Sequence, residues 1–274
     1  MQFTVIPTPE ILKNDVECIR ITHHDGHERL AINVCLNGLP GIAFQHHDGH
    51  SPLEKISTRF GSVATIPTLY IYGQMTEPGI MHHKAEPFTT FQVVLKPHAL
   101  QTLLGLNAST LTNSLIELSE FSGSRLNMQL MDARSDQDRL NLILNFLVTK
   151  LQQARTRDCL VEESLHLIHY HHGSLTVKHL LDSLNISERQ FEKRFIQTVG
   201  LSPHFYMRVK RFNQAIHLMK TGRFQKLTEL AHALNFYDQS HFIRDVKAFS
   251  GITPKDLVQK VDDIQFDQRV YAYF

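Results

Sequence analysis

The 274-residue chain has little cysteine and no long apolar run, and its first residues are not expected to be a secretory leader. Its three cysteines, Cys18, Cys35 and Cys159, are too few and too scattered for a disulfide framework or a cysteine-based zinc site. No run approaches the ~18 apolar residues of a membrane-spanning helix, and the N-terminus lacks a basic region followed by an apolar stretch. We therefore expect a soluble protein in a reduced, cytoplasmic setting, with no membrane partner.

Net charge is also nearly absent, but the charges are unevenly distributed. The whole chain has 28 Lys and Arg against 27 Asp and Glu. Residues 174–260 hold 14 of the basic and 7 of the acidic residues, which leaves 14 and 20 for the rest of the chain. A basic segment beside an acidic one predicts that the basic part binds a polyanion.

The local patterns divide the chain near residues 152–158, QQARTRD. Before this segment, runs of β-branched and aromatic residues predict strands, and Asp25-Gly26 predicts a hairpin turn between the first two of them. Apolar residues at 3- and 4-residue spacing then predict a long helix that ends at the boundary. The strands are expected over 16–22, 29–36, 41–45, 68–75 and 88–95, and the helices over 98–106 and 136–155.

After residue 159 every segment has the pattern of a helix or a turn. We expect a strand-rich α+β domain with following helices over 1–155, an all-α domain over 159–260, and a tail over 261–274 to which no role is assigned. The helices of the second domain are predicted over 160–170, 176–183, 188–197, 203–220, 227–234, 239–248 and 254–260.

The second domain contains an internal repeat with a period of 51 residues. The stretch VGLSP at 199–203 returns as SGITP at 250–254, in each case a glycine, an apolar residue, a hydroxyl residue and a proline. A proline fits the first position of a helix, where its missing N–H is not needed. Each copy is therefore predicted to end one helix and to begin the next.

The helix before each copy has the same register. Ser187 and Asp238, also 51 residues apart, are good N-caps because their side-chain oxygens can accept from free backbone N–H groups. Four and eight residues after each cap, an apolar side chain is predicted to face the core. These residues are Phe191 and Phe195 in the first copy, and Phe242 and Val246 in the second.

A short apolar helix and an asparagine precede each cap. Asn185 and Asn235 stand where a tight turn between two helices requires a left-handed residue, which asparagine tolerates best after glycine. A helix, a sharp turn and a capped second helix form the helix-turn-helix plan. The sequence predicts this plan twice, in identical register.

Polar side chains occupy the face of each second helix opposite its apolar stripe. Donor groups there can reach base edges in a major groove of DNA, while basic groups beside them can bind phosphates. The alternative is a pair of ordinary amphipathic helices with solvated charges. The candidates for base contacts are Arg189, Gln190, Glu192, Lys193, Gln239, Ser240, His241 and Arg244, and those for phosphate contacts are Arg194, Lys210, Arg211 and Lys247.

The helix predicted between the two units, residues 203–220, sets their separation. Eighteen residues at ~1.5 Å each give a rod of ~27 Å, which can hold two reading helices about one turn of DNA apart, ~34 Å. One chain could then cover two adjacent segments of the major groove.

These motifs resemble the DNA-binding domain of the AraC family of bacterial transcription regulators. The resemblance covers about residues 159–260 and includes both helix-turn-helix units, the linking helix and HFIRDVKAFSGITPKDL at 241–257. It departs from the family pattern at Leu181, where a small residue is usual, at the two turn asparagines, and at Val246. The resemblance implies sequence-specific binding of double-stranded DNA.

The N-terminal half resembles the poorly characterised sensor domains that precede such DNA-binding regions, through FQVVLKPHALQTLLGL at 91–106. A regulator of this type is expected to respond to a small-molecule effector, to act as a homodimer in some cases, and to contact RNA polymerase if it activates transcription. No cofactor and no catalytic residue is expected.

Histidines form the main alternative to this interpretation. The motif HHDGH occurs at 23–27 and again at 46–50, and imidazoles from neighbouring hairpins could bind a transition metal. A metal-binding, cupin-like enzyme or sensor is therefore one alternative, and a protein-interaction module with degenerate helix-turn-helix units is another. The candidate metal ligands are His23, His27, His46, His50 and His82.

Overall fold

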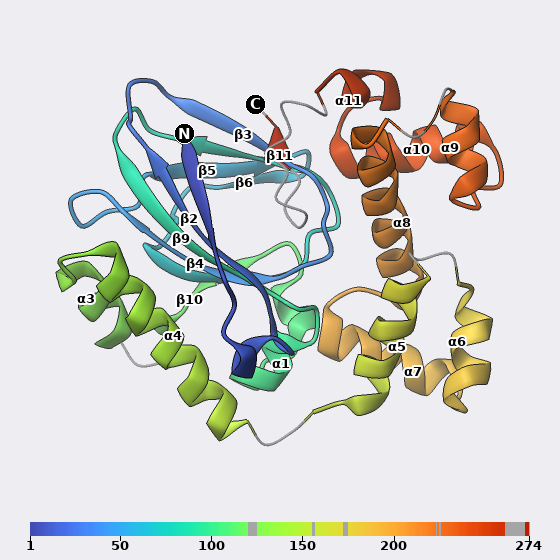
Figure 1. Cartoon of the computed structure of the whole chain (residues 1–274), viewed down its shortest axis with the longest axis horizontal. Coiled ribbons are helices and arrows are strands. Elements are labelled where there is room, and N and C mark those ends of the chain that lie inside the picture. The colour runs from blue at the N-terminus through green and yellow to red at the C-terminus, as the bar shows by residue number, and fades with distance from the viewer. Residues whose placement is uncertain are drawn as a thin grey trace.

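The computed structural model describes residues 1–119, 125–154, 157–171, 175–222, 224, 226–260 and 272–273. The chain forms a strand-rich N-terminal part and a helical C-terminal part, as the sequence predicts (Figure 1). No helix within these residues is long and apolar enough to cross a membrane.

Within the described residues, the strand-rich part contains two antiparallel sheets. The first has six strands in the order β1-β2-β9-β4-β7-β10, and the second has five in the order β11-β3-β8-β5-β6. The strands are β1 (Gln2–Ile6), β2 (Val16–His24), β3 (Leu30–Val34), β4 (Gly41–His46), β5 (Leu53–Thr58), β6 (Gly61–Val63), β7 (Leu69–Tyr72), β8 (Gly79–His83), β9 (Phe88–Leu95), β10 (Leu115–Glu117) and β11 (Ala272–Tyr273).

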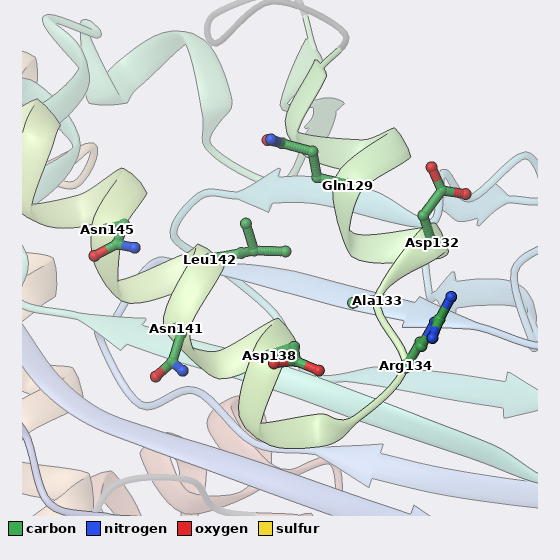
Figure 2. A pocket seen from close by; sticks show the side chains of 8 residues that line it. All are labelled: Gln129, Asp132, Ala133, Arg134, Asp138, Asn141, Leu142 and Asn145. Atoms are coloured by element: carbon green, nitrogen blue, oxygen red, sulfur yellow. The ribbon is translucent and has the colours of Figure 1, made fainter.

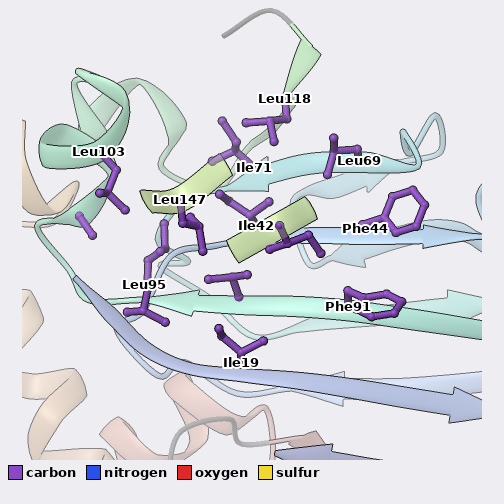
Figure 3. Close-up of a cluster of buried hydrophobic side chains, with 14 of the residues drawn as sticks. Ile19, Ile42, Phe44, Leu69, Ile71, Phe91, Leu95, Leu103, Leu118 and Leu147 are labelled. Carbon is purple, nitrogen blue, oxygen red and sulfur yellow. The ribbon is translucent and has the colours of Figure 1, made fainter. Parts of the chain in front are cut away.

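Helices cover one face of the six-stranded sheet and bury the main core of this part. The register places Phe91 of β9 opposite Ile21 of β2 and Phe44 of β4, so the three side chains lie on one face of the sheet. Leu147 of α4 packs onto this cluster (Figure 3). The covering helices are α1 (Ala99–Leu104), α3 (Arg125–Asp132) and α4 (Asp136–Gln153), with the short 3-10 helices η1 (Glu10–Leu12) and η2 (Ala108–Leu111) beside them.

The expected hairpin at Asp25-Gly26 is wrong. Strand β2 pairs with β1 and β9 in the first sheet, whereas β3 pairs with β8 and β11 in the second. The turn at Gly26, with φ of 79°, therefore carries the chain from one sheet to the other. The second Asp-Gly, residues 48 and 49, does form a tight turn: both residues have positive φ, and His47 and His50 exchange backbone hydrogen bonds across it.

The helical part is arranged around α8 (Pro203–Lys220). Figure 1 shows one helix-turn-helix unit at each end of this helix, with the strand-rich part along its side. The other helices are α5 (Cys159–Tyr170), α6 (Val177–Leu184), α7 (Glu188–Val199), α9 (Leu227–Ala233), α10 (Gln239–Ser250) and α11 (Pro254–Lys260). Each predicted helix of residues 159–260 is present, with ends that differ by at most two residues.

The predicted boundary and tail lie partly outside the described residues. Residues 155 and 156 of the boundary segment are not described, and α5 begins at Cys159. Within the tail only 272–273 are described, and they form β11 at the edge of the second sheet, paired with Asn33 and Val34. Residues 272–273 therefore lie beside the N-terminal part.

Candidate DNA-binding surface

Both helix-turn-helix units have the backbone geometry that their turns require. Asn185 has φ of 50° and Asn235 has φ of 55°, so both are left-handed as predicted. The helices α7 and α10 then end at Gly200 and Gly251, with φ of 87° and 84°. A Cβ atom on Gly200 would also lie 3.0 Å from the carbonyl oxygen of Ala108. Glycine at this position therefore serves both the turn and a close contact with the N-terminal part.

The two helices begin differently. In α10 the carboxylate of Asp238 accepts a 2.6 Å hydrogen bond from the backbone N–H of His241, which is the predicted cap. In α7 Ser187 occupies the cap position, but its hydroxyl donates to Oε1 of Gln190 at 3.1 Å. Ser187 therefore holds the side chain of Gln190 at the N-terminus of α7. The sequence had predicted a bond from Ser187 to a backbone N–H instead.

The apolar stripes anchor each helix in its own core. Phe191 and Phe195 are fully buried beside Leu180 of α6. Phe242 and Val246 are fully buried in a second cluster with residues of α8, α9 and α11. Both orientations are as predicted, and they turn the opposite face of each helix to solvent.

Seven of the eight candidate base-contact side chains are exposed on these outward faces. His241 is the exception because it is half-buried, with its ring 5.5 Å from that of Phe236 and its Nε2 atom 3.8 Å from the carboxylate of Asp245. Its orientation is therefore constrained before any DNA is bound. The exposed seven are Arg189, Gln190, Glu192, Lys193, Gln239, Ser240 and Arg244.

Two of the four candidate phosphate contacts, Arg194 and Lys210, have partners within the chain. Arg194 makes a two-bond ion pair with Asp158, at 2.6 and 2.8 Å, and this hydrogen bonding raises the pKa of its guanidinium. Lys210 is half-buried, with its Nζ atom 5.6 Å from the centre of the Tyr206 ring. Burial lowers the pKa of Lys210, and the nearby carboxylate of Glu17 only partly opposes this.

The other two basic candidates differ in accessibility. Lys247 is exposed on α10. Arg211 is half-buried, with its guanidinium 5.0 Å over the Phe236 ring and an Nη1 hydrogen bond of 3.3 Å to the carbonyl of Asn235. Arg211 therefore supports the turn of the second unit, and Lys247 is the freer of the two.

An ion pair that the sequence did not predict connects the linking helix to the second recognition helix. Arg208 of α8 donates to both carboxylate oxygens of Asp245 of α10, at 2.7 and 3.3 Å. Asp245 is only 2% exposed. Asp245 stands one residue before Val246, on the buried side of α10. A buried acid needs a partner, so this position could have predicted the ion pair.

The N-terminal part contacts the C-terminal end of both recognition helices. The hydroxyl of Thr112 donates a 2.6 Å hydrogen bond to the carbonyl of Gly200, after α7. The backbone N–H of Leu36 donates to the carbonyl of Phe249, in the last turn of α10, at 3.1 Å. Between them, Asn213 of α8 donates to the carbonyl of Asn37 at 2.8 Å. The N-terminal part therefore contacts both helix-turn-helix units and the helix between them.

The histidines proposed as metal ligands do not converge. Within the described ranges, no group of three or more His, Cys, Asp or Glu side chains is arranged to hold a metal ion. Each candidate has a different setting. His23 bonds to Thr89, His27 lies near Asp25, His46 faces Arg139, His50 bonds to Glu86, and His82 bonds to Ser57.

A cavity of about 510 Å³ lies between α3 and α4. Figure 2 shows that its wall is mostly polar, with acids and amides from both helices and Leu142 as its one large apolar side chain. Asp138, on its wall, accepts a hydrogen bond from the hydroxyl of Ser135, the residue that caps α4. This composition suits water better than an apolar ligand.

Segments of both parts of the chain match known family models. Residues 180–260 match the family model of a helix-turn-helix domain of the AraC type, and residues 4–117 match a domain of unknown function (DUF6597). No curated protein is similar enough in sequence to count as a relative. The chain therefore carries an AraC-type helix-turn-helix domain, a domain of DNA-binding transcription regulators. The matched class consists of regulators and not of enzymes.

Solved structures also match the chain, at low identity and with TM-scores under 0.5. One is ToxT from Vibrio cholerae, at 12% identity and a TM-score of 0.48, covering 88% of this chain and 97% of that chain. A ToxT structure bound to an unsaturated fatty acid has 15% identity and a TM-score of 0.47, and covers 88% of this chain and 94% of that one. The xylose-binding activator XylR has 19% identity and a TM-score of 0.33, over 45% of this chain and 38% of that one. Likeness at these values says nothing of function.

Proposed function

We propose that α7 and α10 read two adjacent segments of the major groove, in one chain. The exposed donors of α7, Arg189 and Lys193, and those of α10, Ser240 and Arg244, are the side chains that would contact base edges. What supports this is the equal register of the two helices: in each, the cap, the buried stripe and the exposed donors stand at the same offsets. The linking helix of 18 residues spans ~27 Å, close to the rise of one DNA turn.

Basic side chains beside these helices would supply the phosphate contacts. Arg194, Lys210, Arg211 and Lys247 are the candidates, and Lys247 is exposed on the second helix. Because neutralising phosphates releases condensed counterions, we expect the affinity for DNA to fall steeply with salt concentration. The role is one of binding, and we propose no catalytic activity.

We further propose that residues 1–155 form a domain that senses a small-molecule effector and that residues 159–260 form the DNA-binding domain. The contacts of Thr112 with Gly200 and of Leu36 with Phe249 support this, because a change in the first domain would reach both reading helices. RNA polymerase, for an activator, and a second copy of the chain are the further partners proposed. The cytoplasm is the proposed location because it contains the DNA.

A gel-shift titration tests the proposal. Purified chain is mixed with DNA from upstream of its own and of neighbouring genes, and the midpoint is followed against salt. A shift that resists unlabelled competitor of unrelated sequence is the expected result. Arg189→Ala and Arg244→Ala should each weaken the specific complex. If no upstream fragment is preferred and both variants bind like the parent, DNA reading is wrong, and a protein-interaction role for the two units would replace it.

A further inference from the structure

One flank of the two recognition helices carries different side chains in the two copies of the repeat. In α7 this flank carries Glu188 and Glu192, and 51 residues further on, in α10, it carries Gln239 and Ile243. All four side chains are exposed. The members of each pair are four residues apart, so they lie one turn apart on the same side of their helix. The two units therefore differ by two negative charges along this flank.

Ile243 is a large apolar side chain on the outward surface of α10. It is 36% exposed and belongs to none of the buried apolar clusters that the described residues form. A single exposed apolar side chain is common on protein surfaces, so exposure alone assigns it no role. Its neighbours do: Gln239 lies one turn before it, Lys247 one turn after it, and Arg244 beside it. An apolar group among these proposed DNA contacts meets DNA whenever they do.

A second exposed apolar side chain stands at the N-terminal end of the same helix. Tyr237 is 91% exposed and directly precedes the cap residue Asp238. In the first unit, over residues 175–200, no large apolar side chain has comparable exposure. The N-terminal end of a recognition helix is the end that contacts base edges. The second unit is therefore the more apolar of the two where it would face DNA, and the first is the more strongly charged.

The major groove offers different partners to an acid and to an apolar side chain. Cytosine presents its N4 amino group there, and a carboxylate can accept from it. Thymine presents its 5-methyl group, which favours an apolar contact. Both groups lie on the pyrimidine side of a base pair, so side chains at one common offset in two helices of equal register can reach either of them. Glutamate at this offset therefore favours cytosine, and isoleucine favours thymine.

We propose that Ile243 determines specificity by contacting the 5-methyl group of a thymine, and that Glu192, at the same offset in α7, accepts from the N4 amino group of a cytosine. This inference rests on the proposed function, because both contacts require the two helices to enter the major groove. The helices α7 and α10 lie near opposite ends of α8 (Figure 1), so the two bases belong to different segments of the site. The site is then asymmetric, and the chain binds it in one orientation.

Uracil substitution tests the methyl contact. A binding selection with the full chain on a randomised duplex first identifies the preferred site. Each thymine of that site is then replaced in turn by uracil, which removes the methyl group and keeps every hydrogen-bonding group. We expect one replacement, in one segment, to weaken binding about fourfold, which corresponds to ~0.8 kcal/mol for one apolar carbon. If no thymine responds to the replacement, the contact does not exist.

A variant assigns the responding methyl group to its side chain. Ile243→Ala should bind the thymine and the uracil duplex with equal affinity, because the apolar partner of the methyl group is gone. The matched control is Ile80→Ala, since Ile80 has the same exposure, 36%, but lies on β8 of the N-terminal part. The control should keep the fourfold difference. A difference that persists in Ile243→Ala would refute the assignment.

Exchanging the two side chains tests the asymmetry of the site. A selection with Ile243→Glu should replace the responding thymine by cytosine and leave the other segment unchanged. Glu192→Ile should replace a cytosine by thymine in that other segment. Both positions are exposed, so we expect both variants to fold, and circular dichroism checks this. Selected sites that remain the same as the parent site in both variants would overturn the proposal.

The selections also separate this inference from the proposed function. If the parent chain enriches no sequence, the DNA-reading proposal fails and the role of Ile243 fails with it. If a sequence is enriched but neither uracil nor the exchanged side chains alter its binding, DNA reading stands and the role of Ile243 is wrong.

Discussion

The hydroxyl of Thr112 donates a 2.6 Å hydrogen bond to the carbonyl oxygen of Gly200, the residue that ends the first recognition helix. The two residues are 88 positions apart in the chain and belong to different parts of the molecule. The bond satisfies a carbonyl that a helix end leaves without an internal partner. It therefore stabilises α7 and connects it to the N-terminal part at the same atom.

Removing this bond should loosen the contact between the two parts. We expect Thr112→Val, which keeps the shape and removes the donor, to lower the free energy of unfolding by about 1 kcal/mol. Chemical denaturation measures this loss, and limited proteolysis near residues 152–158 should become faster. Thr149→Val is the matched control, since that hydroxyl bonds only within its own helix, to the carbonyl of Asn145. Equal losses in both variants would contradict a special role for Thr112.

The buried pair of Arg208 and Asp245 predicts a larger effect. Arg208→Met leaves the carboxylate of Asp245, 2% exposed, without its cation, and we expect a loss of ~3–5 kcal/mol. Arg208→Met combined with Asp245→Leu should recover much of that loss, because no charge then remains buried. Urea denaturation of the two single variants and the double variant measures the coupling. Additive losses would show that the pair is not coupled.

The two exposed cations of α10 should affect DNA binding in different ways. We expect Arg244→Ala to cost ~1–3 kcal/mol and to relax selectivity at one base position. Lys247→Ala should weaken binding to all sequences alike and reduce the slope of affinity against salt by about one unit. Binding selections with a randomised site distinguish these results. A change of base preference in Lys247→Ala would show that Lys247 contacts a base, and the roles assigned to Lys247 and Arg244 would then be exchanged.

The left-handed turn residues predict a simple comparison of substitutions. Asn185 has φ of 50°, which a residue with a Cβ atom adopts only at some cost and glycine adopts freely. We expect Asn185→Ala to destabilise the chain by about 1 kcal/mol and Asn185→Gly to be nearly neutral. Thermal unfolding measures both. The prediction fails if the alanine variant is as stable as the glycine variant.

His83 should make the N-terminal part sensitive to acid. Burial, followed by His24 and His82, lowers the pKa of His83 from 6.5 to about 4. The unfolded chain therefore takes up a proton between these values that the folded chain does not, so stability falls as the pH drops from 6.5 to about 4. The loss is ~3 kcal/mol at the lower end. His83→Leu should remove this loss in urea denaturation near pH 7 and pH 4.5, whereas His27→Leu, at an exposed site, should not.

Much of the helical part could be predicted from the sequence because its signals are local. Caps, turn asparagines and apolar spacing each act within one or two helical turns. The 51-residue repeat contains each of these signals twice. The assignment of Phe191, Phe195, Phe242 and Val246 to the core is confirmed by their burial.

The N-terminal part could be predicted only as strand-rich. Strand pairing depends on residues far apart in sequence, and the local turn signal at Asp25-Gly26 does not tell which sheet follows. β1, β5, β6, β8 and β10 were not predicted, since each is short or partly polar. The engagement of Arg194 by Asp158 and the burial of Lys210 also depend on tertiary contacts, so a basic residue near a recognition helix could not be assigned to phosphate from its position alone.

The contacts of the N-terminal part with the ends of α7 and α10 are made to main-chain carbonyl oxygens, at Gly200 and Phe249. A carbonyl is present whatever side chain a residue carries. The side chains on the outward face of either helix can therefore change one by one, and any DNA sequence they contact can change with them, while the attachment of the helix to the N-terminal part stays the same.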